Sequence, residues 1–467
     1  MTTQKTKSTW QKVRKLFNDI HLWIGLASGI IVILVCLSGT LYVFNTELRE
    51  MASPELYKVK HDKSAKPIAV EELVAKVNAG TGGKVASVKI PADPNRAYQF
   101  MVRLKDKEEG KDKERGKEGG ERARGPEHKS DGHVAKKDND HKGAKEEKNG
   151  KGDKRSEKGK EGPGGGKRPS AFAVNQYTGE ILGNISESKT ATASFMQTMF
   201  SLHRWLLLDK IEKPLFGELE NRKLGSYISG TATILFTLGV ITGMVIWFPQ
   251  KIRAWKQGLK IKWDGSWKRK NHDLHNSLGF YACIFLFLMG ITGPQWSFPW
   301  YREALRKTLG TYQPEGFEPP KDPVSKLTLN TIKPLNITDY LMAADRVLPY
   351  KGDYSISLPK DSTSAIAITK NKTGFFAPSA GDKVLLDQYT ASVLKIEVYR
   401  DKPFNERVSG SIKALHLGDV YGMFTKIIYF FACLIATSLP ITGTIIWLNK
   451  LKKKNKVKHK KIKQPVL

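Results

Sequence analysis

The 467-residue chain carries 77 lysine and arginine residues against 46 aspartate and glutamate residues, which gives a formal net charge of +31. Much of this charge flanks long apolar segments, so it indicates contact with a membrane surface, and we expect no nucleic-acid partner. The three cysteines, Cys36, Cys283 and Cys433, all lie inside apolar segments, which excludes a disulfide framework outside them.

Four apolar segments are almost free of charge and long enough for a helix that spans the hydrocarbon core, which takes about 20 residues. They predict transmembrane helices at residues 22–44, 227–248, 275–298 and 427–448. The first segment is about twice as long as the apolar region of a signal peptide, so we expect an uncleaved anchor. The predicted fold class is an α-helical membrane protein with four transmembrane helices.

Lysine and arginine residues gather in three segments that lie between or beyond these helices. The three segments are residues 1–21, 249–274 and 449–467. By the positive-inside rule they are cytoplasmic. Both termini are then inside, and the long segments 45–225 and 299–425 are outside.

The first outer segment combines a helical pattern with strands. Apolar residues have helical spacing at 70–77. Alternating patterns predict strands at 85–90, 98–104 and 171–174. Between the last two strands, residues 105–168 are almost wholly charged residues and glycine, so we expect a disordered insertion that cannot form a core.

The second outer segment repeats this order of elements. A helix is predicted at 337–347. Strands are predicted at 354–358, 365–369 and 383–387. Each outer segment is therefore expected to form a small α+β module.

Short motifs also repeat in the same order in the two halves of the chain. The matched motifs are His21-Leu-Trp-Ile-Gly25 and His275-Asn-Ser-Leu-Gly279, Leu37-Ser38-Gly39 and Ile291-Thr292-Gly293, Leu202-His203 and Leu415-His416, and Ile241-Thr-Gly and Ile441-Thr-Gly. Each half reads as span, outer module, histidine segment and span. This pattern predicts a tandem repeat.

Four of the ten histidines lie at the predicted membrane surfaces. His21 and His275 begin spans one and three on the inner side, and His203 and His416 precede spans two and four on the outer side. Ionisable residues at a membrane are costly and mark functional sites, and imidazole is a common axial ligand of haem iron. Two histidines at each face predict two bis-histidine haems, which are b-type because the chain has no C-x-x-C-H motif.

Glycines follow two of these histidines at helical spacing. Gly25 and Gly29 follow His21, and Gly279 follows His275, so each histidine shares a helix face with a residue that has no side chain. Such a face leaves room for a flat macrocycle. The alternative is that the glycines serve helix packing and the histidines bind lipid headgroups.

Two further residues belong to the candidate site. His272 lies three residues before His275 on a similar helix face, so it is an alternative ligand, although the repeat favours His275. Arg204 follows His203 directly and is placed to neutralise a haem propionate, because guanidinium pairs well with carboxylate. An interfacial arginine without a ligand is the alternative.

The chain resembles the PepSY-associated transmembrane helix family. The resemblance rests on Asp19-Ile-His21-Leu-Trp-Ile-Gly25 with Ser38-Gly39, Leu202-His203-Arg-Trp205, Asp273-Leu-His275 with Thr292-Gly293, and Leu415-His416-Leu-Gly418 with Gly422. It covers the chain apart from the insertion and the tails, and the charged insertion departs from the family pattern. It implies a bacterial inner membrane protein with two periplasmic PepSY-like modules.

The resemblance also implies a function, because the family includes ferrisiderophore reductases. The two haems are expected to carry electrons to ferric iron held by a siderophore or another chelator outside, during iron uptake. The electron donor stays open between a membrane quinol and a separate reductase, since the sequence has no nucleotide-binding fingerprint.

Two other functions compete with this one. By its PepSY-like modules, the chain also resembles a membrane-anchored regulator of a peptidase. A permease is a further alternative. Neither function needs a cofactor. Four aromatic residues beyond span three are also open to two interpretations, a platform for a ligand or an interfacial belt, of which the belt is favoured. They are Trp296, Phe298, Trp300 and Tyr301.

Overall fold

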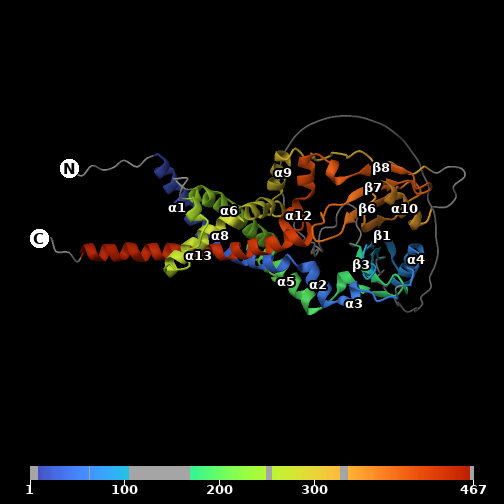
Figure 1. Ribbon diagram of the computed structural model, residues 1–467, viewed down its shortest axis with the longest axis horizontal. Helices are drawn as coiled ribbons and strands as arrows, with labels where there is room; N and C mark the ends of the chain where they lie inside the picture. The colour runs from blue at the N-terminus through green and yellow to red at the C-terminus, as the bar shows by residue number, and fades with distance from the viewer. Residues whose placement is uncertain (1–8, 63, 105–168, 249–254, 327–334, 463–467) are drawn as a thin grey trace, which may run out of the picture.

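The computed structural model describes residues 9–62, 64–104, 169–248, 255–326 and 335–462. The predicted insertion 105–168 lies outside these residues. A bundle of long helices forms one end of the molecule, and a sheet with its covering helices forms the other (Figure 1). The start of the first helix and the end of the last lie on the side away from the sheet. We call the two ends of the bundle the terminal end and the sheet end.

Four helices among the described residues are long and apolar enough to cross a membrane, as the sequence predicted. They are α1 (Thr9–Tyr42), α6 (Asn221–Trp247), α8 (Trp267–Thr292) and α13 (Gly422–Ile462). All four begin before the predicted span, and α13 also continues well past it, because polar and basic residues prolong the helix beyond the apolar segment.

Small residues lie at the centre of the helix bundle. Helices α1 and α8 each pack against both α6 and α13. Ala282 and Leu286 of α8 are buried against Ala432 and Ala436 of α13. Alanine allows close approach of two helices, and close packing is what holds helices together in lipid.

The strands form one antiparallel sheet of eight strands. They are β1 (Lys84–Ile90), β2 (Tyr98–Arg103), β3 (Ser170–Val174), β4 (Ile181–Asn184), β5 (Gly352–Ser357), β6 (Ile366–Lys372), β7 (Asp382–Leu386) and β8 (Val393–Glu397). Their order is β4-β3-β2-β1-β5-β6-β7-β8. The six predicted strands are present, and the two outermost strands, β4 and β8, were not predicted.

The two outer segments share this sheet and do not form separate sheets. Strand β1 of the first segment pairs with β5 of the second, with Ser87 opposite Ser357 and Ile90 opposite Tyr354. Helices α4 (Val70–Thr81) and α10 (Ile337–Val347) pack against one common core. The modules therefore form a single body, because each completes the hydrogen bonding of the other's innermost strand.

Short helices connect the sheet to the bundle, and two of them carry predicted site residues. These two are α5 (Ala191–Trp205), which packs on α1 and α6, and α12 (Ile412–Leu417), which packs on α8. The remaining short helices are α2 (Asn45–Ala52), α3 (Pro54–Tyr57), α7 (Trp255–Gly258), α9 (Pro299–Thr308) and α11 (Phe404–Gly410), with 3-10 turns η1 (Ile185–Glu187), η2 (Leu208–Lys210), η4 (Pro294–Trp296) and η5 (Tyr399–Asp401).

Candidate functional site

The four histidines singled out by the sequence lie in two pairs, one at each end of the bundle. At the terminal end, His21 of α1 faces His275 of α8, with ring centroids 6.2 Å apart and ring planes at 81°. At the sheet end, His203 of α5 faces His416 of α12, with centroids 6.1 Å apart and planes at 62°. We call these the terminal-end pair and the sheet-end pair.

The ring separations in both pairs match a metal held between two imidazoles. A metal–imidazole nitrogen bond is about 2 Å long and that nitrogen lies about 1 Å from its ring centroid, so two imidazoles on opposite sides of one metal have centroids about 6 Å apart. Two rings in ordinary edge-to-face contact also have centroids about 4.5–7 Å apart, so the separation alone fits both arrangements. The geometry of both pairs therefore fits the axial ligands of one haem iron.

The same ring nitrogen, Nδ1, makes the hydrogen bonds of the terminal-end pair. His21 Nδ1 lies 3.0 Å from the Gly239 carbonyl oxygen and 3.1 Å from Thr242 Oγ1. His275 Nδ1 lies 2.9 Å from Thr442 Oγ1. These contacts engage Nδ1 of each ring and leave Nε2 as the nitrogen available to a metal.

The sheet-end pair has the same arrangement of hydrogen bonds. His203 Nδ1 donates to the Val35 carbonyl oxygen at 2.8 Å. His416 Nδ1 lies 3.2 Å from the Met289 carbonyl oxygen and 3.0 Å from Thr292 Oγ1. An N–H at Nδ1 that is held by a carbonyl leaves the lone pair on Nε2, which is the usual arrangement of a metal-ligating histidine.

The sheet-end histidines are also held in the neutral form that a metal requires. Loss of solvation lowers the pKa of His203. Loss of solvation, followed by the charges of His203 and Arg204, lowers the pKa of His416 to about 3. Both rings are therefore uncharged near neutral pH and keep a free nitrogen lone pair.

A glycine faces each of the four imidazole rings. A Cβ added at Gly243 would lie 3.1 Å from His21 Cε1, and one at Gly443 would lie 3.3 Å from His275 Cε1. At the sheet end, a Cβ at Gly39 would lie 3.1 Å from His203 Cε1, and one at Gly293 would lie 3.4 Å from His416 Cε1. The Thr-Gly motifs at 242–243 and 442–443 thus supply both a hydrogen bond and room for a ring.

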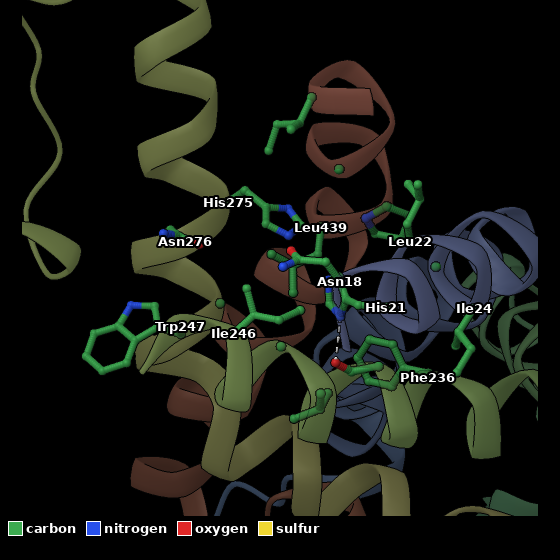
Figure 2. A pocket seen from close by; sticks show the side chains of 18 of the residues that line it. Asn18, His21, Leu22, Ile24, Phe236, Ile246, Trp247, His275, Asn276 and Leu439 are labelled. Atoms are coloured by element: carbon green, nitrogen blue, oxygen red, sulfur yellow. Dashed lines mark hydrogen bonds between the residues drawn. The ribbon is translucent and has the colours of Figure 1, made fainter. Parts of the chain in front are cut away.

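The terminal-end pair lines a cavity of about 500 Å³ between the four long helices. Figure 2 shows His21 and His275 reaching toward one another there, among apolar side chains such as Phe236 and Leu439. Its volume is within the range of roughly 300–1,000 Å³ that is usual for cofactor sites. Five glycines line it: Gly25, Gly239, Gly243, Gly279 and Gly443.

Two of the three glycines singled out by helical spacing border this cavity. A Cβ at Gly25 would meet nothing within 4 Å, so this face of α1 adjoins open space, and Gly279 also lines the cavity. Gly29 has a different role, since its Cβ would lie 3.3 Å from Cβ of Pro440. Gly29 therefore permits close packing of α1 on α13.

His272, the alternative to His275, lines the mouth of the cavity and does not face His21. Half of its side chain is exposed, and its Nδ1 lies 3.6 Å from a carboxylate oxygen of Asp273. Asp273 also accepts a hydrogen bond of 2.8 Å from Arg269. The structure thus pairs His275 with His21, as the repeat predicted, and places His272 at the surface.

Arg204 lies beside the sheet-end pair. Its guanidinium donates to the Trp296 carbonyl oxygen at 2.9 Å. The Trp296 ring in turn lies 5.0 Å from the His416 ring, edge to face. Burial, followed by the charges of Arg222 and Arg302, lowers the pKa of Arg204. Arg204 therefore belongs to a group of three arginines near this pair.

The predicted aromatic group divides into packed and exposed residues. Phe298 stacks on Tyr227, with centroids 5.6 Å apart, and the hydroxyl of Tyr301 donates to the Ile291 carbonyl oxygen. Trp300 is 60% exposed. Three of the four residues thus anchor the connection between α8 and α9, and Trp300 alone of the four is open to a ligand or to lipid.

Sequence reasoning identified the histidines but did not identify the groups that orient them. Thr242 and Thr442 stand in the repeated Ile-Thr-Gly motif, so their position carried a signal, although their role did not. The carbonyl groups of Val35 and Met289 carried no signal, because every residue has a carbonyl. These two are nevertheless equivalent positions, four residues before Gly39 and Gly293.

Comparison with protein families gives a match over most of the chain. The model of the PepSY-associated TM region matches residues 19–450, which is nearly the whole chain and includes all four paired histidines. A comparison with curated proteins finds no match. Because the match covers far more than half of the sequence, this chain belongs to the PepSY-associated TM region family.

Proposed function

We propose that this protein carries two b-type haems, one on each histidine pair, and passes electrons across the bacterial inner membrane to ferric iron. The observation that carries the proposal is the matched geometry of the two pairs. Each has ring centroids about 6 Å apart and a hydrogen-bonded Nδ1 on both rings. His21 and His275 would hold one haem iron, and His203 and His416 would hold the other.

The bound haem would supply one-electron transfer, and the side chains of this chain adapt the site to that role. Threonine hydroxyls and backbone carbonyls fix the orientation of each imidazole. Glycines leave room for a flat group. Two histidine ligands leave iron no open position, which favours electron transfer over oxygen chemistry.

The direction of transfer follows from the distribution of charge. The basic segments adjoin the terminal end of the bundle, and by the positive-inside rule this supports a cytoplasmic terminal end and a periplasmic sheet. We assign the eight-stranded sheet to two PepSY-like modules of a tandem repeat, supported by the matched contacts of Thr242 and Thr442 with the two inner histidines. Electrons would then run from the terminal-end pair to the sheet-end pair.

The proposed acceptor is ferric iron in a siderophore or another chelate, taken up for its iron. Each turnover moves one electron from the donor to Fe³⁺ and gives Fe²⁺, and no bond within the chelator breaks. Hard oxygen ligands hold iron by its charge, so the lower charge weakens every iron–oxygen bond and favours release. The donor is a quinol, which gives two electrons and two protons and serves two turnovers, or a separate reductase.

The test is a count of haem in purified protein. We expect two b-type haems per chain from a pyridine haemochrome assay, with a reduced-minus-oxidised spectrum of low-spin haem. Alanine at His21, His203, His275 or His416 should each remove about one haem. The control is His272→Ala, which should keep both.

A second step tests the reaction. Protein in vesicles, reduced with a quinol analogue, should convert a ferric chelate to a ferrous product that a ferrous-specific dye traps outside, and the histidine variants should not. A colourless preparation from cells with ample haem would overturn the redox proposal. It would leave a PepSY-based regulator or a permease without cofactor as the better interpretation.

A further inference from the structure

Three arginines gather around the turn between α8 and α9, at the sheet end of the bundle. Arg204 donates to the Trp296 carbonyl oxygen at 2.9 Å, and Arg302 of α9 donates to the Gln295 carbonyl oxygen at 3.1 Å. Arg222, in the first turn of α6, lies over the Trp205 ring at 4.1 Å. Helices α5, α6 and α9 thus bring three guanidinium groups to one place. We call them the arginine cluster.

The cluster has no counter-charge within the described ranges of the chain. None of its three guanidinium groups lies within 4.0 Å of a carboxylate there. The acidic residues nearest in sequence are engaged elsewhere, with Glu220 paired to Lys223 and Glu303 paired to Lys307. Three like charges at one place repel one another, so the cluster favours a bound anion.

Two helix ends add to the positive potential of this place. Helices α6 and α9 both begin here, and neither has an acidic residue in its first turn. Ser226 of α6 donates to Ser297, just before α9, at 3.1 Å, so the two helix starts lie together. A helix start carries a partial positive charge, and arginines there are unfavourable unless an anion is bound.

The cluster lies next to the sheet-end pair on one side and to solvent on the other. Arg204 adjoins His203 in sequence and holds Trp296, whose ring lies 5.0 Å from the His416 ring. Arg222 and Arg302 are exposed, and Trp300, two residues before Arg302 in α9, is 60% exposed. An anion on the two outer arginines is therefore close to the proposed exit of electrons.

We propose that Arg222 and Arg302, with Arg204 behind them, form the docking site for an anionic, carboxylate-bearing ferric chelate. This inference names the substrate class of the proposed reductase and rests on the proposed function. Guanidinium groups bind carboxylates through paired, charge-assisted hydrogen bonds, so arginine suits this class of ligand. The exposed Trp300 adds an apolar surface against which the chelate packs. The positive potential also speeds the arrival of an anion.

The test measures binding separately from electron transfer, with gallium(III) citrate as a redox-inert analogue of a ferric chelate. Calorimetric titration uses oxidised full-length protein in phosphatidylcholine nanodiscs. We expect saturable binding that weakens as salt rises, and at least a 10-fold loss of affinity in the Arg222→Gln/Arg302→Gln double variant. The matched control is Arg306→Gln. Arg306 is an exposed arginine of α9, the helix that carries Arg302, and this variant should bind as the unchanged protein does.

Four outcomes would overturn the inference and would leave the proposed function standing. The double variant binds the citrate complex as well as the unchanged protein. Alternatively, it loses the sheet-end haem, which assigns the arginines to the propionates. In the third case, a cationic gallium trihydroxamate binds more tightly than the citrate complex. If phosphatidylglycerol in the nanodisc abolishes citrate binding, the cluster is a lipid site and the inference also fails; a protein without haem would instead overturn the proposed function.

Discussion

The two histidine pairs have nearly equal ring separations, but different elements hold them. The terminal-end histidines stand on the long helices α1 and α8, and threonines of α6 and α13 orient them. The sheet-end histidines stand on the short helices α5 and α12, and carbonyl groups of α1 and α8 orient them. Helices α1 and α8 therefore supply ligands at one end and hydrogen-bond acceptors at the other.

This difference shows how one pair of helices serves two sites. The terminal-end pair depends on the bundle alone, because all its partners lie on the four long helices. The sheet-end pair depends also on the segments that connect the sheet to the bundle, because α5 and α12 are the last α-helices of these segments before α6 and α13. Changes inside the bundle should therefore affect the terminal-end pair first, and changes at the ends of α5 and α12 should affect the sheet-end pair alone.

The largest expected effect comes from filling the cavity at the terminal end. In Gly25→Leu, the new side chain enters the open space beside His21, where an added Cβ meets nothing within 4 Å. Helix propensity improves by about 1 kcal/mol or slightly less, so the fold should not suffer. We expect a protein of unchanged or higher thermal stability that lacks the terminal-end haem and keeps the other, as measured by haemochrome count and melting curve.

The matched control for this variant is Gly29→Ala on the same helix. Its Cβ would lie 3.3 Å from Cβ of Pro440, and Gly29 itself does not line the cavity, so the variant should strain the packing of α1 on α13 slightly and keep both haems. If Gly25→Leu retained two haems, the cavity would not be the haem site.

A second substitution should remove the sheet-end haem alone. Gly418 ends α12 two residues after His416, with a φ of +75°, and an added Cβ would overlap the ring of the buried Tyr429. The left-handed conformation costs roughly 1–2 kcal/mol for any other residue, and the overlap adds to it. In Gly418→Val, α12 must move, and His416 moves with it. We expect the spectrum of one haem, that of the terminal-end pair.

Gly82→Ala separates backbone strain from the overlap. Gly82 caps the C-terminal end of α4, the helix that packs on the sheet, with a φ of +66°. An added Cβ there meets nothing within 4 Å. This variant should lose stability by a similar backbone term and keep both haems. Loss of both haems in Gly418→Val would mean that the two pairs are not independent.

The sequence predicted the parts of this comparison that depend on periodicity or repetition. The four long helices followed from the length of their charge-free apolar segments, the helix at 337–347 followed from apolar spacing, and the expected pairing of histidines followed from the repeat. The join between β1 and β5 had no such signal, because it links residues as far apart as Ser87 and Ser357. Strand β4 was missed because it has four residues, one of them glycine, and β8 was missed because its side chains are largely exposed.

The smallest expected effect tests the groups that orient the rings. Thr442→Val keeps the shape of the side chain and removes the hydroxyl that lies 2.9 Å from His275 Nδ1. Loss of such a partner lowers metal affinity by about 10- to 100-fold, so the terminal-end haem should be bound more weakly and the sheet-end haem equally well. Thr444→Val is the control, since Thr444 also lines the cavity but bonds to the Pro440 carbonyl oxygen. Titration of haem into protein purified without it measures both sites in one experiment. Equal haem affinity in Thr442→Val and Thr444→Val would show that helix packing alone fixes the His275 ring. The terminal-end pair would then need no side-chain hydroxyl, like the sheet-end pair, whose partners are mainly backbone carbonyls.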